Sequence, residues 1–161
     1  AQRGELTVLV GGDQNKFEEA KDIFEKFCRN MIYLGEVGKA TKLKLINNMV
    51  LGGYMAVLAE AMAIGEKAGL EKELLLEVLS NGAGRSYVLE VKKQKLLEEK
   101  FEPHFSVELM YKDLHYAQDL FKDFKAFSMV LQNVKEVYGF ARSKDLGHLD
   151  FSVVYKIFKT E

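Results

Sequence analysis

Lys44 and Asn48 are the two residues whose types and spacing best suit chemistry in this sequence. They lie near the start of GKATKLKLINNMVLGGYMAVLAE, residues 38–60, a stretch apolar enough to form a buried helix. Four residues apart on a helix, both side chains lie on one face. An ammonium and a carboxamide placed there can bind one hydroxyl or carbonyl oxygen. A lysine whose pKa is lowered by burial can also take or give a proton at that oxygen.

A structural role is the alternative interpretation of this pair. Lysine readily extends its amine into water, so Lys44 and Asn48 could merely cover the start of the helix. Burying an ammonium without a partner is costly, however, and a lysine that faces a cleft usually serves chemistry or an anionic ligand. The sequence shows no Ser-His-Asp set, P-loop or HExxH motif, so the pair is the best candidate for chemistry.

The composition argues against several classes of function. A formal net charge of −1 over 161 residues gives no reason to expect nucleic acid or an anionic membrane as a partner. The longest uncharged run, Leu45 to Ala59, is shorter than the ~20 residues of a membrane span. The single cysteine, Cys28, suits the reducing cytosol, and we expect it to be buried. We expect no metal site, because metal-ligand spacing is absent from the three histidines: His104, His115 and His148.

The hydrophobic pattern predicts a short β-α-β segment at the start of the chain. GELTVLVGGD and MIYLG read as strands, and DQNKFEEAKDIFEKFCRN between them reads as a helix capped by Asp13. Two strands are too few for an independent sheet. We therefore expect them to complete a sheet whose other strands lie outside this sequence.

The helix that begins at Gly38 is the centre of the predicted fold. It can run to about Ala68, a length of ~45 Å, before Gly69 stops it. Because it is apolar nearly all round, we expect other helices to cover it, and Gly52 and Gly53 suggest close approach of another backbone. Five further helices are predicted in EKELLLEVLSNG, YVLEVKKQKLLEEK, SVELMYKDLHYAQDLFKDF, SMVLQNVKEVYGFARSK and FSVVYKIFK.

GEVGKATKLKLINNM, residues 35–49, resembles the GxxG…KxxNN segment of the β-hydroxyacid dehydrogenases. That family includes 3-hydroxyisobutyrate dehydrogenase, tartronate semialdehyde reductase and the related 6-phosphogluconate dehydrogenases. The resemblance covers essentially the whole chain. It continues in GELTVLVGGD, AEAMAIGEKAGL, FEPHFSVELMYKDLHYA and EVYGFARSKDLGHLDFSVVY.

The resemblance implies a mainly α fold, an all-helical bundle around a long central helix, preceded by a short β-α-β remnant of a Rossmann domain. Residues 1–37 would end an N-terminal dinucleotide-binding domain. Residues 38–161 would form a helical domain that binds substrate and forms the dimer contact.

The same resemblance assigns roles to four residues. Lys44 takes the position of the family's catalytic lysine, and Asn48 that of the asparagine that contacts the substrate. Lys112 and Phe105 take the positions of a lysine and an aromatic residue at the nicotinamide cofactor. The turn NGAGRS, through Ser86, is a further candidate for the wall of the substrate pocket.

The implied activity is the interconversion of a short β-hydroxyacid and its semialdehyde with NAD or NADP, in a cytoplasmic homo-oligomer, either dimer or tetramer. A phosphorylated sugar acid is a weaker candidate substrate because no cluster of arginines is apparent. The family's GxGxxG fingerprint and its upstream serine-glycine-glycine segment are absent. We therefore expect a missing N-terminal domain to bind most of the cofactor, and this chain alone to be inactive. The alternative is a non-catalytic oligomerisation or interaction module derived from the same fold.

Overall fold

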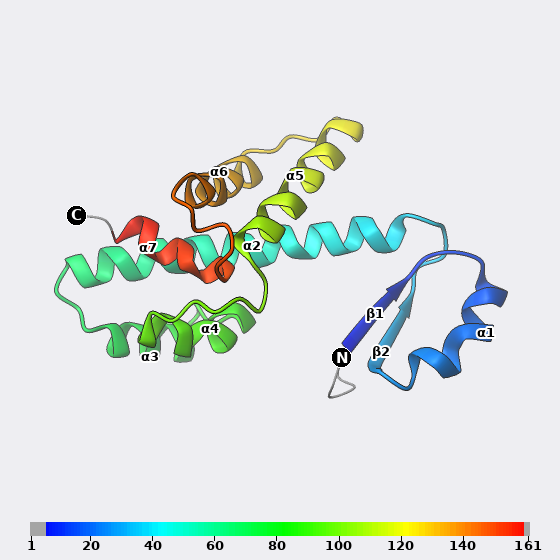
Figure 1. Ribbon diagram of the computed structural model, residues 1–161, viewed down its shortest axis with the longest axis horizontal. Coiled ribbons are helices and arrows are strands. Elements are labelled where there is room, and N and C mark those ends of the chain that lie inside the picture. The colour runs from blue at the N-terminus through cyan, green and yellow to red at the C-terminus, as the bar shows by residue number, and fades with distance from the viewer. Residues whose placement is uncertain (1–5, 160–161) are drawn as a thin grey trace. The chain divides into compact units, whose positions relative to one another are not determined.

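Two parallel strands and one helix form the first part of the chain in the computed structural model, which describes residues 6–159. Strand β1, Leu6–Val10, pairs with β2, Cys28–Tyr33, and helix α1, Gln14–Phe24, connects them (Figure 1). The Asp13 carboxylate caps α1 by accepting a hydrogen bond from the backbone N–H of Lys16, as predicted. The predicted β-α-β segment is therefore confirmed.

The boundary between α1 and β2 differs from the prediction. The predicted helix extended through Asn30, whereas α1 ends at Phe24 and β2 already begins at Cys28. Residues of this segment pair with β1, with Cys28 opposite Leu6 and Asn30 opposite Thr7. Pairing with a strand some twenty residues earlier thus overrides the local helical pattern. Cys28 is buried, as expected.

Helix α2, Lys39–Lys67, is the longest helix among the described residues. Gly69 follows it with a φ of +83°, a left-handed conformation that glycine adopts without strain, which confirms the predicted stop. By length and composition alone α2 could cross a membrane, but half of its most apolar window is buried inside the protein. A core helix of a globular protein passes the same test.

The remaining helices surround the later part of α2. In Figure 1, α3, Lys72–Asn81, and α4, Tyr87–Glu98, lie on one side of it, and α5, Val107–Asp123, and α6, Val130–Ser143, lie on the other. A short 3-10 turn, Phe151–Val153, leads into α7, Val154–Phe158. The fold class predicted from the sequence, a helical bundle around a long central helix after a β-α-β segment, is confirmed. The structure divides into two compact units, one up to Asn47 and one from Asn48 onward.

The packing of α2 differs from the prediction in two respects. Its surface is not covered all round, because Tyr54, Val57 and Ile64 are each more than half exposed. At Gly52, side chains and not a backbone occupy the space: an added Cβ would lie 3.0 Å from the Met110 sulfur. The Tyr138 hydroxyl also donates to the Gly52 carbonyl oxygen at 3.1 Å, so α6 is fastened to α2 at this point.

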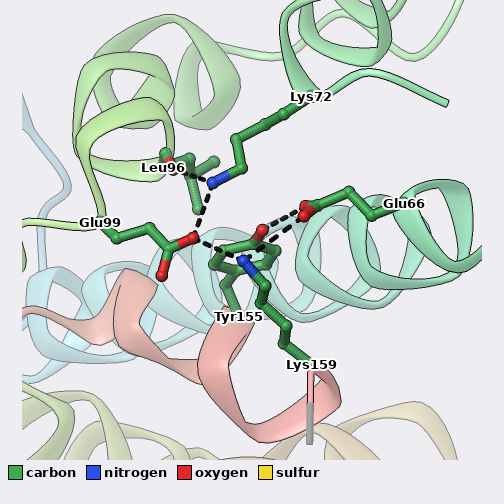
Figure 2. A network of polar contacts seen from close by, with 6 residues as sticks. All are labelled: Glu66, Lys72, Leu96, Glu99, Tyr155 and Lys159. Carbon is green, nitrogen blue, oxygen red and sulfur yellow. Dashed lines mark hydrogen bonds and ion pairs between the residues drawn. The ribbon is translucent and has the colours of Figure 1, made fainter. Parts of the chain in front are cut away.

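A polar network joins α7 to the ends of α2, α3 and α4. The Glu99 carboxylate lies between the ammonium groups of Lys72 and Lys159, at 2.7 and 2.6 Å (Figure 2). The Tyr155 hydroxyl donates to Glu66 beside them. Hydrogen bonds from Lys159 and Lys72 lower the pKa of Glu99 to about 2. The two ion pairs of Glu99 therefore contribute stability only while this carboxyl is ionised.

We expect Glu99→Gln to lower the free energy of unfolding by up to about 1 kcal/mol near pH 7, as for other partly exposed ion pairs. Because the folded-state pKa lies below the unfolded value of about 4.3, this stabilisation is present above that value and is lost as the pH falls toward 2. The free energies of unfolding of variant and parent, measured by urea titration, should therefore become equal as the pH is lowered. Glu77→Gln, at an exposed position on α3, is the control. A constant difference between variant and parent at every pH would contradict the prediction.

Candidate active site

Lys44 lies in the second turn of α2, beside a shallow hollow of about 350 Å³. The other residues that line the hollow are Thr7 and Leu9 of β1 and Ala40 and Thr41 of α2. Lys44 is exposed in this chain, so the burial on which the proton-transfer argument relied is not present here. The hollow is large enough to admit a small molecule beside the ammonium.

Asn48, four residues further along α2, is buried at 8% exposure. Its side-chain Nδ2 donates a hydrogen bond of 2.6 Å to an Oδ2 of Asp113, which lies on α5 and is 2% exposed. An ionised carboxylate can only accept, so the amide nitrogen must face it. The Asp113 carboxylate thereby fixes which way the Asn48 amide points, and the Asn48 carbonyl oxygen must accept from another direction.

Lys112 and Phe105 belong to the same part of the structure as Asp113. Lys112 precedes Asp113 on α5 and is exposed, while Phe105 is half-buried in the segment that leads into α5. Ser106 begins that helix by accepting a hydrogen bond from the backbone N–H of Leu109. The helix that holds Asn48 in place therefore also carries Lys112, and Phe105 lies just before its start.

Asp113 is a site residue that sequence reasoning missed. The buried face of α5 follows helical spacing through Val107, Met110, Leu114 and Ala117, and Asp113 lies within it. Aspartate is almost never fully buried without a partner. A charged residue on an otherwise apolar helical face is the signal that could have identified it.

Other candidates from the sequence lie elsewhere. Ser86 is occupied as the N-cap of α4, accepting from the backbone N–H of Leu89. It lines an apolar groove beside α2, and none of the four predicted site residues is among the groove's lining residues. The three histidines are exposed, and within residues 6–159 no group of three or more His, Cys, Asp or Glu side chains could hold a metal ion.

The helical bundle around one long helix, with a lysine and a buried asparagine one turn apart on it, defines the class of protein. It resembles the helical domain of the β-hydroxyacid dehydrogenase family. Residues 38–158 match the family described as NAD-binding of NADP-dependent 3-hydroxyisobutyrate dehydrogenase, and the chain belongs to that family. Residues 1–35 match the NAD binding domain of 6-phosphogluconate dehydrogenase.

Three relatives illustrate the similarity. The chain is 31% identical to 2-(hydroxymethyl)glutarate dehydrogenase of Eubacterium barkeri, over 99% of this chain and 53% of that protein. It is 37% identical to the cytokine-like nuclear factor N-PAC of Anopheles gambiae, over 96% of this chain and 27% of that protein. The solved structure of Mycobacterium tuberculosis 3-hydroxyisobutyrate dehydrogenase with L-serine has a TM-score of 0.88 at 28% identity, over 99% of this chain and 57% of that one. The chain thus spans about half or less of these relatives.

We predict that Asn48→Asp lowers the free energy of unfolding by on the order of 3 kcal/mol, because it replaces the amide donor with a second carboxylate against a buried one. The exchange variant Asn48→Asp/Asp113→Asn restores an amide-to-carboxylate bond in the reverse direction and should recover most of this loss. Denaturant titrations of the single variants and the exchange variant measure the coupling. An exchange variant no more stable than Asn48→Asp would show that the bond has little energetic weight.

Proposed function

We propose that the full-length protein is an NAD(P)-dependent dehydrogenase that interconverts a short β-hydroxyacid and its semialdehyde. The observation that carries this proposal is the geometry at the start of α2. There an asparagine, held by a buried aspartate, lies one turn from a lysine that borders an open hollow. Membership of the dehydrogenase family supports the same reaction. This chain alone is proposed to be inactive, because its sequence has no GxGxxG turn for the cofactor pyrophosphate.

Lys44 is the proposed general acid and base. On oxidation its neutral amine accepts the proton of the substrate hydroxyl, and on reduction its ammonium donates a proton to the carbonyl oxygen. Asn48 binds the same oxygen or the substrate carboxylate, and Asp113 keeps the Asn48 amide oriented for that contact. The fixed amide reduces the ordering that substrate binding would otherwise require.

The residues near the start of α5 fit one side of a nicotinamide nucleotide. The exposed ammonium of Lys112 suits a phosphate or a carboxamide oxygen, and the half-buried ring of Phe105 suits a flat heterocycle. When bound, the nicotinamide supplies the hydride transfer. NAD and NADP both remain candidates. The proposed division is nucleotide binding by the domain that ends at residue 37 and substrate binding by residues 38–161.

The proposed substrates share one chemical feature. The Eubacterium relative is named for 2-(hydroxymethyl)glutarate, and the Mycobacterium structure contains L-serine. Each of these compounds has a hydroxymethyl group on the carbon next to a carboxylate. We infer that the substrate of this protein has the same arrangement. A panel of such acids with both nicotinamides, on the full-length protein, tests the class.

Lys44→Ala in the full-length protein should lower kcat by about 10²–10⁴-fold, the usual effect of losing a general acid or base, with the fold intact. Lys42→Ala, two residues away on the same helix, is the matched control and should keep the parental rate. Steady-state kinetics and circular dichroism of both variants make the comparison. A Lys44→Ala enzyme with full kcat would rule out the assigned role.

A second candidate function is a non-catalytic interaction module on the same fold. The similarity to N-PAC favours it, because that relative is named as a nuclear factor and not as a dehydrogenase. The presence of Lys44, Asn48 and Lys112 in this chain favours the enzyme. Absence of nicotinamide binding and of turnover with every acid of the panel would favour the module.

Self-association is proposed for either function. Tyr54 and Val57 of α2 line an apolar groove of about 510 Å³, together with Val130 of α6 and the turn at residues 83–86. Tyr54, Val57 and Val130 are each more than half exposed. Apolar surface of this kind commonly marks an interface. A second copy of this chain, in a dimer or tetramer, is the proposed occupant.

Val57→Glu should weaken this assembly, because it introduces a charge into the groove that the partner would have to desolvate. We expect the dissociation constant of the assembly to rise by about tenfold or more. Gln132→Glu adds the same charge on α6, on the side opposite Val130 and Val134, and should leave assembly unchanged. Sedimentation equilibrium measures both variants. Unaltered assembly of Val57→Glu would place the interface elsewhere.

A further inference from the structure

Lys92 and Asp150 form a buried ion pair that the proposed reaction does not use. Lys92 lies on α4, Asp150 precedes the 3-10 turn, and their side chains are 5% and 0% exposed. The Lys92 Nζ lies 2.9 Å from the carboxylate. Burial opposes ionisation of Asp150. Hydrogen bonds from Lys92, Ser152 and the backbone of His104 outweigh that effect and hold its pKa below the usual value.

The Asp150 carboxylate binds the backbone just before α5 through hydrogen bonds. Its Oδ2 accepts hydrogen bonds from the backbone N–H of His104 at 3.0 Å and of Phe105 at 3.4 Å. The next residue along, Phe151, donates its backbone N–H to the Phe105 carbonyl oxygen at 2.9 Å. Both backbone groups of Phe105 are therefore bound by two consecutive residues of the C-terminal segment.

The ring of Phe105 contacts the ring of Phe151, which Lys92 contacts in turn. It meets the Phe151 ring edge to face, with 6.2 Å between the centroids. The Lys92 ammonium lies over the Phe151 ring, 4.5 Å from its centroid. Lys92 thus contacts both the carboxylate that binds the Phe105 backbone and the ring on which the Phe105 side chain rests.

Stability alone does not account for an ion pair at this place. Buried ion pairs can often be replaced by apolar residues of similar volume without loss of stability. Apolar side chains would hold α4 against the C-terminal segment, but they offer no acceptor to the backbone N–H groups of residues 104 and 105. The carboxylate supplies that acceptor, and the lysine allows the carboxylate to remain charged inside the core.

We propose that Lys92 and Asp150 are positioning residues that fix Phe105 in the orientation in which it binds the nicotinamide cofactor. The inference rests on the cofactor role proposed above for Phe105. It extends the cofactor site to residues that do not touch the cofactor. The affinity for the cofactor should then depend on the acceptor at position 150, and the affinity for the hydroxyacid should not.

Two double variants of the full-length protein separate positioning from simple packing. Lys92→Met/Asp150→Asn removes both charges but keeps an acceptor oxygen for the backbone. Lys92→Met/Asp150→Leu removes the charges and the acceptor. NADPH and NADH are each titrated by fluorescence, well below the measured melting temperatures. We expect the Asn variant to bind within about threefold of the parent and the Leu variant to bind about tenfold or more weakly, with the hydroxyacid KM unchanged in both.

Phe105→Leu distinguishes failure of this inference from failure of the cofactor assignment. If Phe105→Leu binds both nucleotides as the parent does, the role of Phe105 is wrong and the inference falls with it. If Phe105→Leu binds weakly, equal affinities of the two double variants overturn the positioning role alone. Should the Leu variant not fold, Phe151→Leu keeps the ion pair and removes only the supporting ring. Its Kd should rise several-fold, and a parental Kd would overturn the proposal.

Discussion

The hydrogen bond between Asn48 and Asp113 is the contact on which the arrangement of the helical unit depends. A carboxylate in an apolar core is costly unless a donor meets it, and the Asn48 amide is such a donor. The bond places Asp113 of α5 opposite Asn48 of α2. Lys112 is the next residue to Asp113 on α5, so its backbone is placed by the same packing. One contact between two core residues therefore links structural stability to the geometry of the candidate site.

Much of the fold follows from local signals in the sequence. The Asp13 cap, the stop of α2 at Gly69 and the serine caps of α4 and α5 need only neighbouring residues. The start of β2 could not be predicted in this way. Residues 25–30 contain no glycine or proline to end a helix, and only pairing with β1 makes Cys28 part of a strand. The exposed stripe on α2 was missed because apolar composition does not show which face other helices cover.

The candidate site shows the same division between local and distant information. The spacing of Lys44 and Asn48 is visible in the sequence, because one helix carries both. The partners of the buried charges are not visible, since Asn48 and Asp113 are 65 residues apart and Lys92 and Asp150 are 58 apart. The sequence does show that two of these charged residues are out of place. Asp113 and Lys92 each occupy a position where the helical period calls for an apolar residue.

Gly52, one turn beyond Asn48, restricts which substitutions the core of the helical unit can accept during evolution. The absence of a side chain there admits the Met110 thioether, which is fully buried on the same helix as Asp113. Protein interiors are packed densely enough that one added methyl group is felt by its neighbours. The side chains at positions 52 and 110 therefore compete for the same space. A larger residue at one position requires a smaller residue at the other, unless the helix that carries Asp113 moves away.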